Sequence, residues 1–229
     1  MSRYRIDPMP APADPSVLTA LEKIETATLG HVRLTGMVDR GIHALDPHQP
    51  ARAGVAVTLA LPAMCSTLMH HAVSLLRPGD ILIVDRLGDD RFACLGGAVA
   101  RAAKVAGAAG VVVDGPVTDL AEILAEGLPV WARGPAQLTT RRLELGGTLN
   151  RPVSCGGVPV LPGDIVLADA SGVVVMPADE AAAEAEAGLA REGRVARTMN
   201  RLAAGERLGD ITGVNARISD LTDPKDPKK

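Results

Sequence analysis

The chain has 229 residues, a net charge of −3 at pH 7 and only 1% aromatic residues. This length allows one large domain, or a compact domain with extensions. The mild net charge supplies no field that attracts nucleic acid or anionic lipid, and the scarcity of aromatic rings disfavours binding by base stacking. We therefore expect neither a nucleic-acid partner nor a membrane partner.

The three cysteines, Cys65, Cys94 and Cys155, lie far apart in the sequence and form no paired motif. This spacing disfavours a zinc site or a disulfide framework, and it predicts buried free thiols in a reducing compartment. The first fifteen residues contain no apolar signal segment, and no run of about 18 apolar residues could span a bilayer. We therefore expect a cytoplasmic protein.

Apolar runs with strand and helix character alternate through the first two thirds of the chain. A proline-rich extended arm over residues 1–15 is followed by a predicted helix over 16–29, with Ser16 as its candidate N-cap. Further predicted elements are strands at 54–62, 81–85, 110–115 and 128–134, and helices at 67–76, 94–106 and 119–125. This alternation favours an α/β core with parallel strands.

The last third of the chain has a different pattern. Residues 153–177 contain several short β-prone runs separated by turns, which predicts a meander of strands that closes the sheet. A helix rich in Ala, Glu and Arg is predicted over 178–204. The predicted parts of the chain are an arm (1–15), an α/β domain (16–177), a C-terminal helical extension (178–215) and a polar tail (216–229).

Two similar segments, 77–89 and 161–173, each contain a Pro-Gly-Asp turn that enters an apolar strand. We expect the turn residues Asp80 and Asp164 to accept hydrogen bonds from nearby backbone amides. Metal binding by these aspartates is the less favoured alternative, because open α/β sheets bind ligands beyond the carboxyl ends of their strands.

The segment from Gly96 to Asp119 carries the candidate site. Gly96 and Gly97 begin a helix rich in alanine, whose free N–H groups could hold a carboxylate or phosphate, although glycines also permit close packing of a helix on a strand. Asp119 follows a buried strand and a Gly115-Pro116 turn. A carboxylate there could bind Mg²⁺ or Mn²⁺ together with waters, or it could cap the helix at 119–125.

The histidines give weaker signals. His70 and His71 are adjacent on one predicted helix and point about 100° apart, so they cannot form one metal-binding face. We expect one of them to be packed and the other exposed, and catalysis by either is disfavoured. The remaining histidines, His31, His43 and His48, lack partner patterns.

An arginine pair, Arg141 and Arg142, lies in a polar loop. The pair could reach an anionic ligand, but a solvated face is the favoured interpretation.

Several segments in order resemble the RraA-like family: PGDILIVD, the Gly-Gly helix rich in alanine, VVVDGPVTD, LPVWARG and the run over 153–177. That family includes class II pyruvate aldolases acting on hydroxymethyl-oxoglutarate and carboxy-hydroxy-oxoadipate, and the regulator of ribonuclease activity A. The resemblance covers Ile24 to Pro177. It implies an α/β/β/α sandwich that assembles as homotrimers or homohexamers, with active sites at subunit interfaces.

In the aldolases of that family, a metal-binding aspartate directly follows an arginine that contacts the substrate, and a further acid lies upstream. The aspartate matches Asp119, whereas the arginine position holds Thr118 and the acid position holds Gly97. The resemblance implies that loop amides hold the substrate carboxylate, and the matching residues are Leu95, Gly96, Gly97 and Ala98. Arg101 or Arg133 could supply the missing positive charge.

The resemblance therefore implies a lyase dependent on Mg²⁺ or Mn²⁺, resembling an aldolase or decarboxylase, that acts on a small 2-oxo or hydroxy carboxylic acid through enolate chemistry. We expect an altered substrate choice, because one threonine hydroxyl replaces the forked, permanently charged donor of arginine. A non-catalytic regulator that binds a ribonuclease is the alternative, and a scaffold that keeps only the oligomer is a third.

Overall fold

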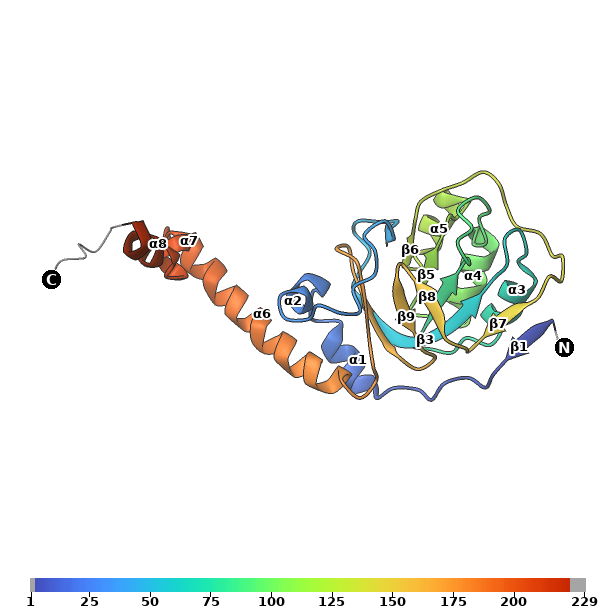
Figure 1. Ribbon diagram of the computed structural model, residues 1–229, viewed down its shortest axis with the longest axis horizontal. Helices are drawn as coiled ribbons and strands as arrows, with labels where there is room; N and C mark the ends of the chain where they lie inside the picture. Colours follow the sequence, from blue (N-terminus) through green and yellow to red (C-terminus); the bar gives the residue numbers. More distant parts are fainter. Residues whose placement is uncertain (1–2, 223–229) are drawn as a thin grey trace. The chain divides into compact units, whose positions relative to one another are not determined.

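The computed structural model describes residues 3–222 (Figure 1). The chain divides into two compact units, Met1–Gly188 and Leu189–Lys229. The first unit contains a large mixed sheet, and the candidate site lies within this unit. Its strands, in spatial order, are β1 (Tyr4–Ile6), β7 (Gly147–Leu149), β3 (Arg52–Ala60), β4 (Asp80–Asp85), β5 (Gly110–Asp114), β6 (Val130–Ala132) and β2 (His43–Ala44).

The four central strands β3, β4, β5 and β6 run parallel to one another. Almost every residue of β3, β4 and β5 is buried, which explains why these strands appear in the sequence as unbroken apolar runs. The predicted α/β core with parallel strands is thereby confirmed.

Helices α3 (Thr67–Val73), α4 (Gly97–Val105) and α5 (Leu120–Glu126) cover one face of the central strands. Ala100 and Ala103 are fully buried on α4, so their small side chains let this helix lie close to the sheet. The predicted helices at 67–76 and 94–106 are confirmed with shorter bounds, and the helix predicted at 119–125 is confirmed one residue further along the chain.

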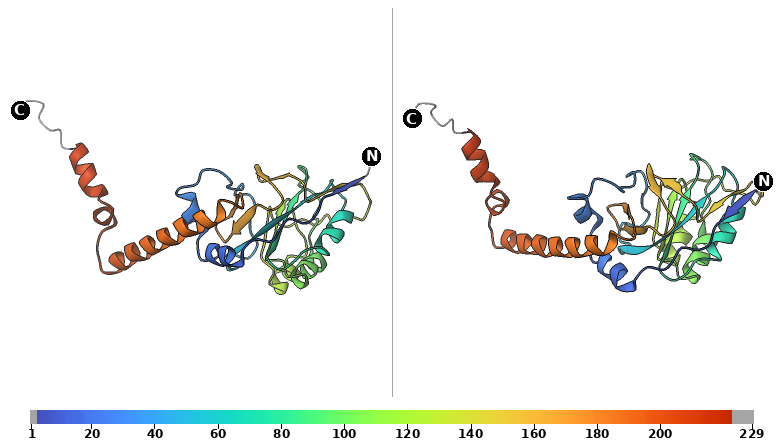
Figure 2. Two further views of the ribbon diagram at one scale, coloured as in Figure 1. Left: turned by 90° about the horizontal axis from the view of Figure 1, so that it is seen from below. Right: turned by 60° about the horizontal axis from the view of Figure 1, so that its bottom comes forward.

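The opposite face is covered by further strands, as the left view of Figure 2 shows for the hairpin formed by β8 (Val153–Cys155) and β9 (Val158–Val160). β10 (Ile165–Ala168) pairs antiparallel with β3 and with β11 (Val173–Met176). The predicted meander is therefore only half right. β10 and β11 extend the large sheet, whereas β8 and β9 form a separate two-stranded sheet.

A third apolar cluster packs helices on the outer side of β10 and β11. It joins α1 (Pro15–Leu21), α2 (Thr26–Gly30) and the first turns of α6 (Ala181–Ala203) to the strands. With the helices α3 to α5 on the far side, these layers form the α/β/β/α arrangement. The helix predicted over 178–204 is confirmed as α6.

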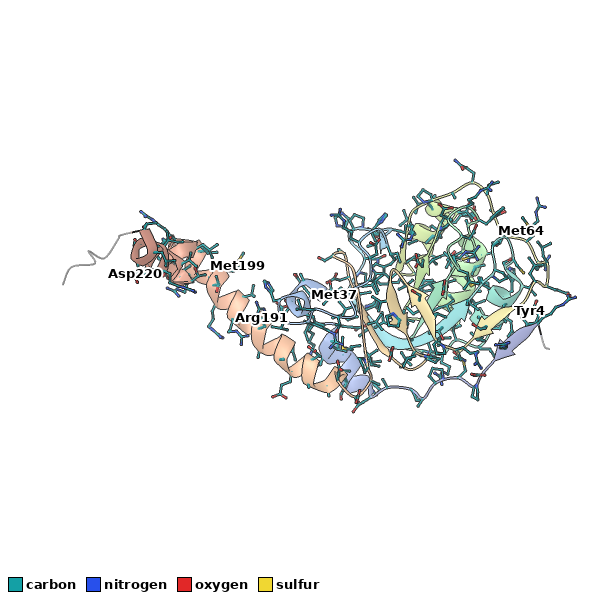
Figure 3. The ribbon with its side chains drawn as sticks, in the orientation of Figure 1. Tyr4, Met37, Met64, Arg191, Met199 and Asp220 are labelled. Atoms are coloured by element: carbon teal, nitrogen blue, oxygen red, sulfur yellow. The ribbon has the colours of Figure 1, made fainter. Side chains whose placement is uncertain are left out.

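Two local predictions in the N-terminal region are wrong. The helix predicted over 16–29 is broken in two, because Thr26 donates its backbone N–H and its hydroxyl to the Asp169 carboxylate, both at 2.7 Å. The N-cap of α1 is Asp14 rather than Ser16, and its carboxylate accepts the Ser16 N–H at 2.8 Å. Residues 4–6 of the predicted arm pair with β7; Tyr4 on this edge strand is labelled in Figure 3.

Other local predictions are confirmed. Asp80 accepts the Arg77 N–H and Asp164 accepts the Leu161 N–H, each at 2.8 Å, so both aspartates close Pro-Gly-Asp turns. All three cysteines are buried and free.

In the second unit, α6 continues to Ala203 and is followed by α7 (Leu208–Ile211) and α8 (Val214–Thr222). Neither α7 nor α8 has a buried residue, and Met199, labelled on α6 in Figure 3, is 60% exposed. Part of the predicted polar tail, 216–222, lies in α8, while 223–229 lie outside the described residues. Over residues 3–222, no helix combines the length and apolar character needed to cross a membrane.

Candidate functional site

The candidate site is a pocket of about 220 Å³ near the carboxyl ends of the parallel strands. Its walls come from the start of α3, the loop before α4, the β5–α5 loop and the segment after β6. The lining residues are Ser66, His70, Ala93, Cys94, Gly96, Ala98, Val99, Thr118, Asp119, Thr139 and Thr140. Three larger hollows, of about 670, 710 and 320 Å³, lie elsewhere and contain none of the predicted site residues.

Asp119 is held in an unusual backbone conformation at the start of α5. Its φ of 53° and ψ of 45° lie in the left-handed region, which aspartate adopts more readily than most residues. Although it occupies the N-cap position of α5, its side chain makes no capping bond there. Instead the carboxylate accepts the Gly97 N–H at 3.2 Å and the Thr118 hydroxyl at 3.2 Å. Asp119 therefore caps α4, the neighbouring helix.

Gly96 and Gly97, at the start of α4, leave room for the side chains of Asp119 and Glu122. A Cβ at Gly96 would collide with the Asp119 carboxylate and lie 2.9 Å from Thr118 Cγ2. A Cβ at Gly97 would overlap the carboxylate of Glu122. Both glycines therefore permit close packing, but against the start of α5 rather than against a strand as the sequence suggested.

Glu122 is a carboxylate beside the start of α4 that the sequence analysis did not select, and it does not itself line the pocket. Its carboxylate lies where a side chain at position 97 would otherwise extend, so Asp119 and Glu122 converge on the N-terminus of α4. The spacing Asp-x-x-Glu is a signal that could have identified the pair, because residues three apart on a helix turn share one face. A carboxylate from α5 therefore occupies the space beside position 97.

The two carboxylates, Asp119 and Glu122, are ligands of the kind that bind a hard divalent cation which keeps most of its water ligands. Within residues 3–222, no cluster of three or more His, Cys, Asp or Glu side chains could hold a metal ion. Mg²⁺ is usually bound by one or two carboxylates with waters in its remaining positions, whereas structural zinc requires four N or S ligands. Asp119 and Glu122 at an exposed position fit the former pattern.

The predicted cationic residues lie outside the pocket lining. Arg101 pairs with Glu126 at 2.6 Å, and this ion pair raises the pKa of its guanidinium; its side chain is 71% exposed. Arg133 pairs with Asp114 at 2.6 Å and with Asp39 at 3.1 Å. Both guanidinium groups are therefore already engaged by carboxylates.

Four further lining residues, Ser66, Thr139, Thr140 and His70, carry hydroxyl groups and one imidazole. Two of them are held by backbone bonds: Ser66 N–H donates to the Arg141 carbonyl at 2.8 Å, and Thr140 N–H donates to the Ala93 carbonyl at 3.1 Å. Burial raises the pKa of the Cys94 thiol, which also lines the pocket, to about 11, so it stays protonated at neutral pH.

The expectation that one of His70 and His71 is packed was wrong, because both are exposed. The buried face of α3 is formed instead by its apolar residues, Leu68, Met69, Ala72 and Val73. Only His70 of the two lines the pocket. Arg141 and Arg142 are exposed and do not line it.

Comparison with known proteins extends these observations. The sequence model of the family described as RraA-like, Aldolase/RraA, matches residues 22–175. The chain belongs to the RraA-like family. The solved structure of Streptomyces coelicolor RraAS2, described as an unusual member of the RNase ES inhibitor RraA protein family, aligns with a TM-score of 0.72 and 29% identity. The alignment covers 82% of this chain and 99% of RraAS2.

Curated RraA-like relatives carry aldolase names. A Halalkalibacterium halodurans protein, provisionally named a 4-hydroxy-4-methyl-2-oxoglutarate aldolase, is 41% identical over 100 residues, which are 44% of this chain and 47% of the relative. A 4-hydroxy-4-methyl-2-oxoglutarate aldolase of Thermus thermophilus is 39% identical over 100 residues, 43% of this chain and 60% of the relative. The chain thus spans about half the length of the curated relatives it matches.

Proposed function

We propose that this protein is a cytoplasmic divalent-metal-dependent carbon–carbon lyase that acts on a small 2-oxo or hydroxy carboxylic acid. The observation that carries the proposal is the convergence of Asp119 and Glu122 on the N-terminus of α4. The aldolase names of relatives that match part of the chain support the same reaction class.

Asp119 and Glu122 would hold Mg²⁺ or Mn²⁺, which when bound would polarise the 2-oxo group of the substrate as a Lewis acid. The amides from Leu95 to Ala98 would hold the substrate carboxylate, because the first N–H groups of a helix have no partner within it. Asp119 already accepts the Gly97 N–H, so the neighbouring amides of this turn carry that role.

Thr118 sets this chain apart from the family aldolases. Its hydroxyl donates to Asp119, so it orients the carboxylate but offers no charge to the substrate. Loss of one such charged donor reduces turnover by about 10²–10³-fold in comparable sites. We therefore propose a substrate choice that differs from that of the standard aldolase.

The test measures pyruvate release from 4-hydroxy-4-methyl-2-oxoglutarate and from oxaloacetate with added Mg²⁺ or Mn²⁺, and Mn²⁺ affinity by electron paramagnetic resonance. Asp119→Asn and Glu122→Gln are expected to weaken Mn²⁺ binding and abolish metal-dependent turnover. Glu126→Gln is the matched control on the same helix, because the Glu126 carboxylate pairs with Arg101 at 2.6 Å. Wild-type Mn²⁺ affinity in Asp119→Asn would refute the metal site.

A second candidate function is a non-catalytic regulator that binds a ribonuclease. The alignment with nearly all of RraAS2, together with Thr118 at the arginine position, favours it. Inhibition of RNase ES cleavage by the purified protein, with no turnover of either oxo acid, would select this alternative.

We also propose that the chain assembles as a homotrimer or homohexamer, as the family resemblance implies. Light scattering coupled to size-exclusion chromatography would distinguish these two states, and a monomeric mass would contradict both.

A further inference from the structure

His70 lines the pocket from α3, whereas Asp119 lines it from the β5–α5 loop. Ser66, Thr139 and Thr140, which also line the pocket, carry hydroxyls that do not titrate near neutral pH. An imidazole changes its protonation state in this range and is the commonest general base in enzymes. His71 provides an internal comparison, because it is equally exposed on the same helix but does not line the pocket.

We propose that His70 is the catalytic residue that accepts the proton of the substrate's C4 hydroxyl, an inference that rests on the proposed lyase function. The substrate class is a 4-hydroxy-2-oxo acid whose carboxylate end lies at the N-terminus of α4 and whose C4 hydroxyl faces α3. In this arrangement the two ends of the substrate are recognised by residues from different elements of the pocket.

The step balances without a further reactant. The imidazole takes the hydroxyl proton, the C3–C4 bond breaks, and C4 becomes a carbonyl carbon. The electron pair of the broken bond forms the C2–C3 double bond of the enolate. The imidazolium then returns its proton to C3, which yields pyruvate and an aldehyde or ketone, with no net gain or loss of protons.

The charged and titratable groups around His70 come from several elements. Asp119 and Cys94 line the same pocket as His70, and the pocket-lining residues of α4, Ala98 and Val99, do not titrate. The loop that packs on the first turn of α3 contributes Arg141 and Glu144, held there through backbone bonds to Ser66 and to the Thr67 hydroxyl. On α3 itself the titratable neighbour is His71, and β7 (Gly147–Leu149) contributes none.

The experiment compares His70→Gln, His70→Ala and His71→Gln with the wild type in Mg²⁺-dependent cleavage of a 4-hydroxy-2-oxo acid. His70→Gln should lower kcat by about 10²–10⁴-fold with little change in KM, the usual contribution of a general base. It should also remove the fall in rate at acid pH, because a protonated imidazole accepts no proton. Added free imidazole should restore part of the rate of His70→Ala. His71→Gln should behave as the wild type.

A second measurement does not depend on turnover. The chain has five histidines, so their ring resonances can be assigned by NMR with single His→Gln variants. Pyruvate added to the wild-type protein should shift the His70 resonance and leave His71 unmoved. An inactive wild type whose His70 resonance still shifts would refute the lyase function while keeping His70 in the binding site. An active wild type matched by His70→Gln, or a His70 resonance that pyruvate leaves unmoved, would overturn the proposal for His70.

Discussion

The Asp119 carboxylate accepts the backbone N–H of Gly97 at 3.2 Å, so the N-cap residue of α5 caps α4 instead of its own helix. Further along the same two helices, Arg101 pairs with Glu126 and Lys104 Nζ donates to the Gly127 carbonyl at 3.1 Å. The position of the candidate metal-binding carboxylate is therefore coupled to the packing of α4 on α5.

Two substitutions at Asp119 distinguish the contribution of the helix cap to the free energy of unfolding from that of the strained backbone. Asp119→Ala loses the cap and keeps a left-handed conformation, so we expect a loss of about 1–2 kcal/mol in the free energy of unfolding. Asp119→Gly also loses the cap but relieves the strain, because glycine adopts positive φ freely. Its stability should lie closer to that of the wild type in urea unfolding. Equal stability of the two variants would show that the left-handed backbone carries no cost.

Gly97→Ala should displace the Glu122 carboxylate, because the new methyl group would occupy its position. We expect lower stability together with weaker Mn²⁺ binding. In the double variant with Glu122→Ala, the stability should recover only in part, because the Cβ atom that alanine keeps at position 122 still lies 2.7 Å from the new methyl group, while Mn²⁺ binding stays weak. Gly193→Ala on α6 is the matched control, since the nearest atom to its Cβ is Arg197 Nη1 at 3.7 Å. That change should add about 0.5–1 kcal/mol to the free energy of unfolding, as glycine-to-alanine changes in helices do.

An acid moved from α5 back to α4 tests whether Glu122 substitutes for the upstream acid of the family. The variant Gly97→Asp combined with Glu122→Ala keeps one carboxylate beside Asp119 but carries it on α4. We expect Mn²⁺ affinity above that of Glu122→Ala alone. Equal affinities of these two variants in the same titration would show that an acid on α4 cannot take over the role of Glu122.

Thr118→Arg should restore the arginine of the family aldolases at a position that lines the pocket. We expect cleavage of 4-hydroxy-4-methyl-2-oxoglutarate to rise by about 10²–10³-fold, the effect of one positioned donor at such a site. Thr118→Lys provides the control, because its ammonium carries the charge without the planar fork. An equal gain in both variants would show that charge alone limits turnover.

Asp164 predicts a pH dependence of stability. Burial raises the pKa of Asp164 above 3.8, with a smaller contribution from Glu180, while the Leu161 N–H lowers it. Because the folded protein holds this proton more tightly than the unfolded chain, the stability from this group is present below pH 3.8 and is lost as the pH rises through the folded pKa. Asp164→Asn should therefore gain in Tm relative to the wild type as the pH is raised.

Asp14 provides a control, because its contribution to stability should change with pH in the opposite direction. The Ser16 hydroxyl and backbone N–H lower the pKa of Asp14 below 3.8. Its stabilising contribution is present above that value and is lost as the pH falls through the folded pKa. Asp14→Asn should therefore lose in Tm relative to the wild type as the pH rises, and parallel trends for the two variants would contradict both assignments.

The parts of the fold that were predictable from sequence are those governed by local pattern. Buried parallel strands such as β4 form unbroken apolar runs, and Pro-Gly-Asp turns satisfy their own amides. β1 and β7 have only three residues each and lack such a pattern, because their pairing depends on distant partners. The break between α1 and α2 depends on Asp169, which lies far along the chain.

The candidate site was also predictable only where local sequence pattern governs it. The order of strand, turn and helix indicated that Asp119 lies near the carboxyl ends of the strands. The approach of Glu122 to Gly97 joins two elements, and the sequence order alone does not reveal it. The exposure of His70 depends on which face of α3 packs on the sheet, and an adjacent histidine pair does not reveal that face.

The hairpin β8–β9 is attached to the central sheet through main-chain atoms as well as through its buried side chains. Asp85 and Asp114, partners in register at the ends of β4 and β5, accept the backbone N–H groups of Ser154 at 3.1 Å and Gly156 at 2.7 Å. Main-chain donors are the same whichever side chains the hairpin carries. The outward-facing residues of this segment can therefore diverge among homologues while its attachment persists, which makes the hairpin a place where evolution can vary the surface without disturbing the sheet.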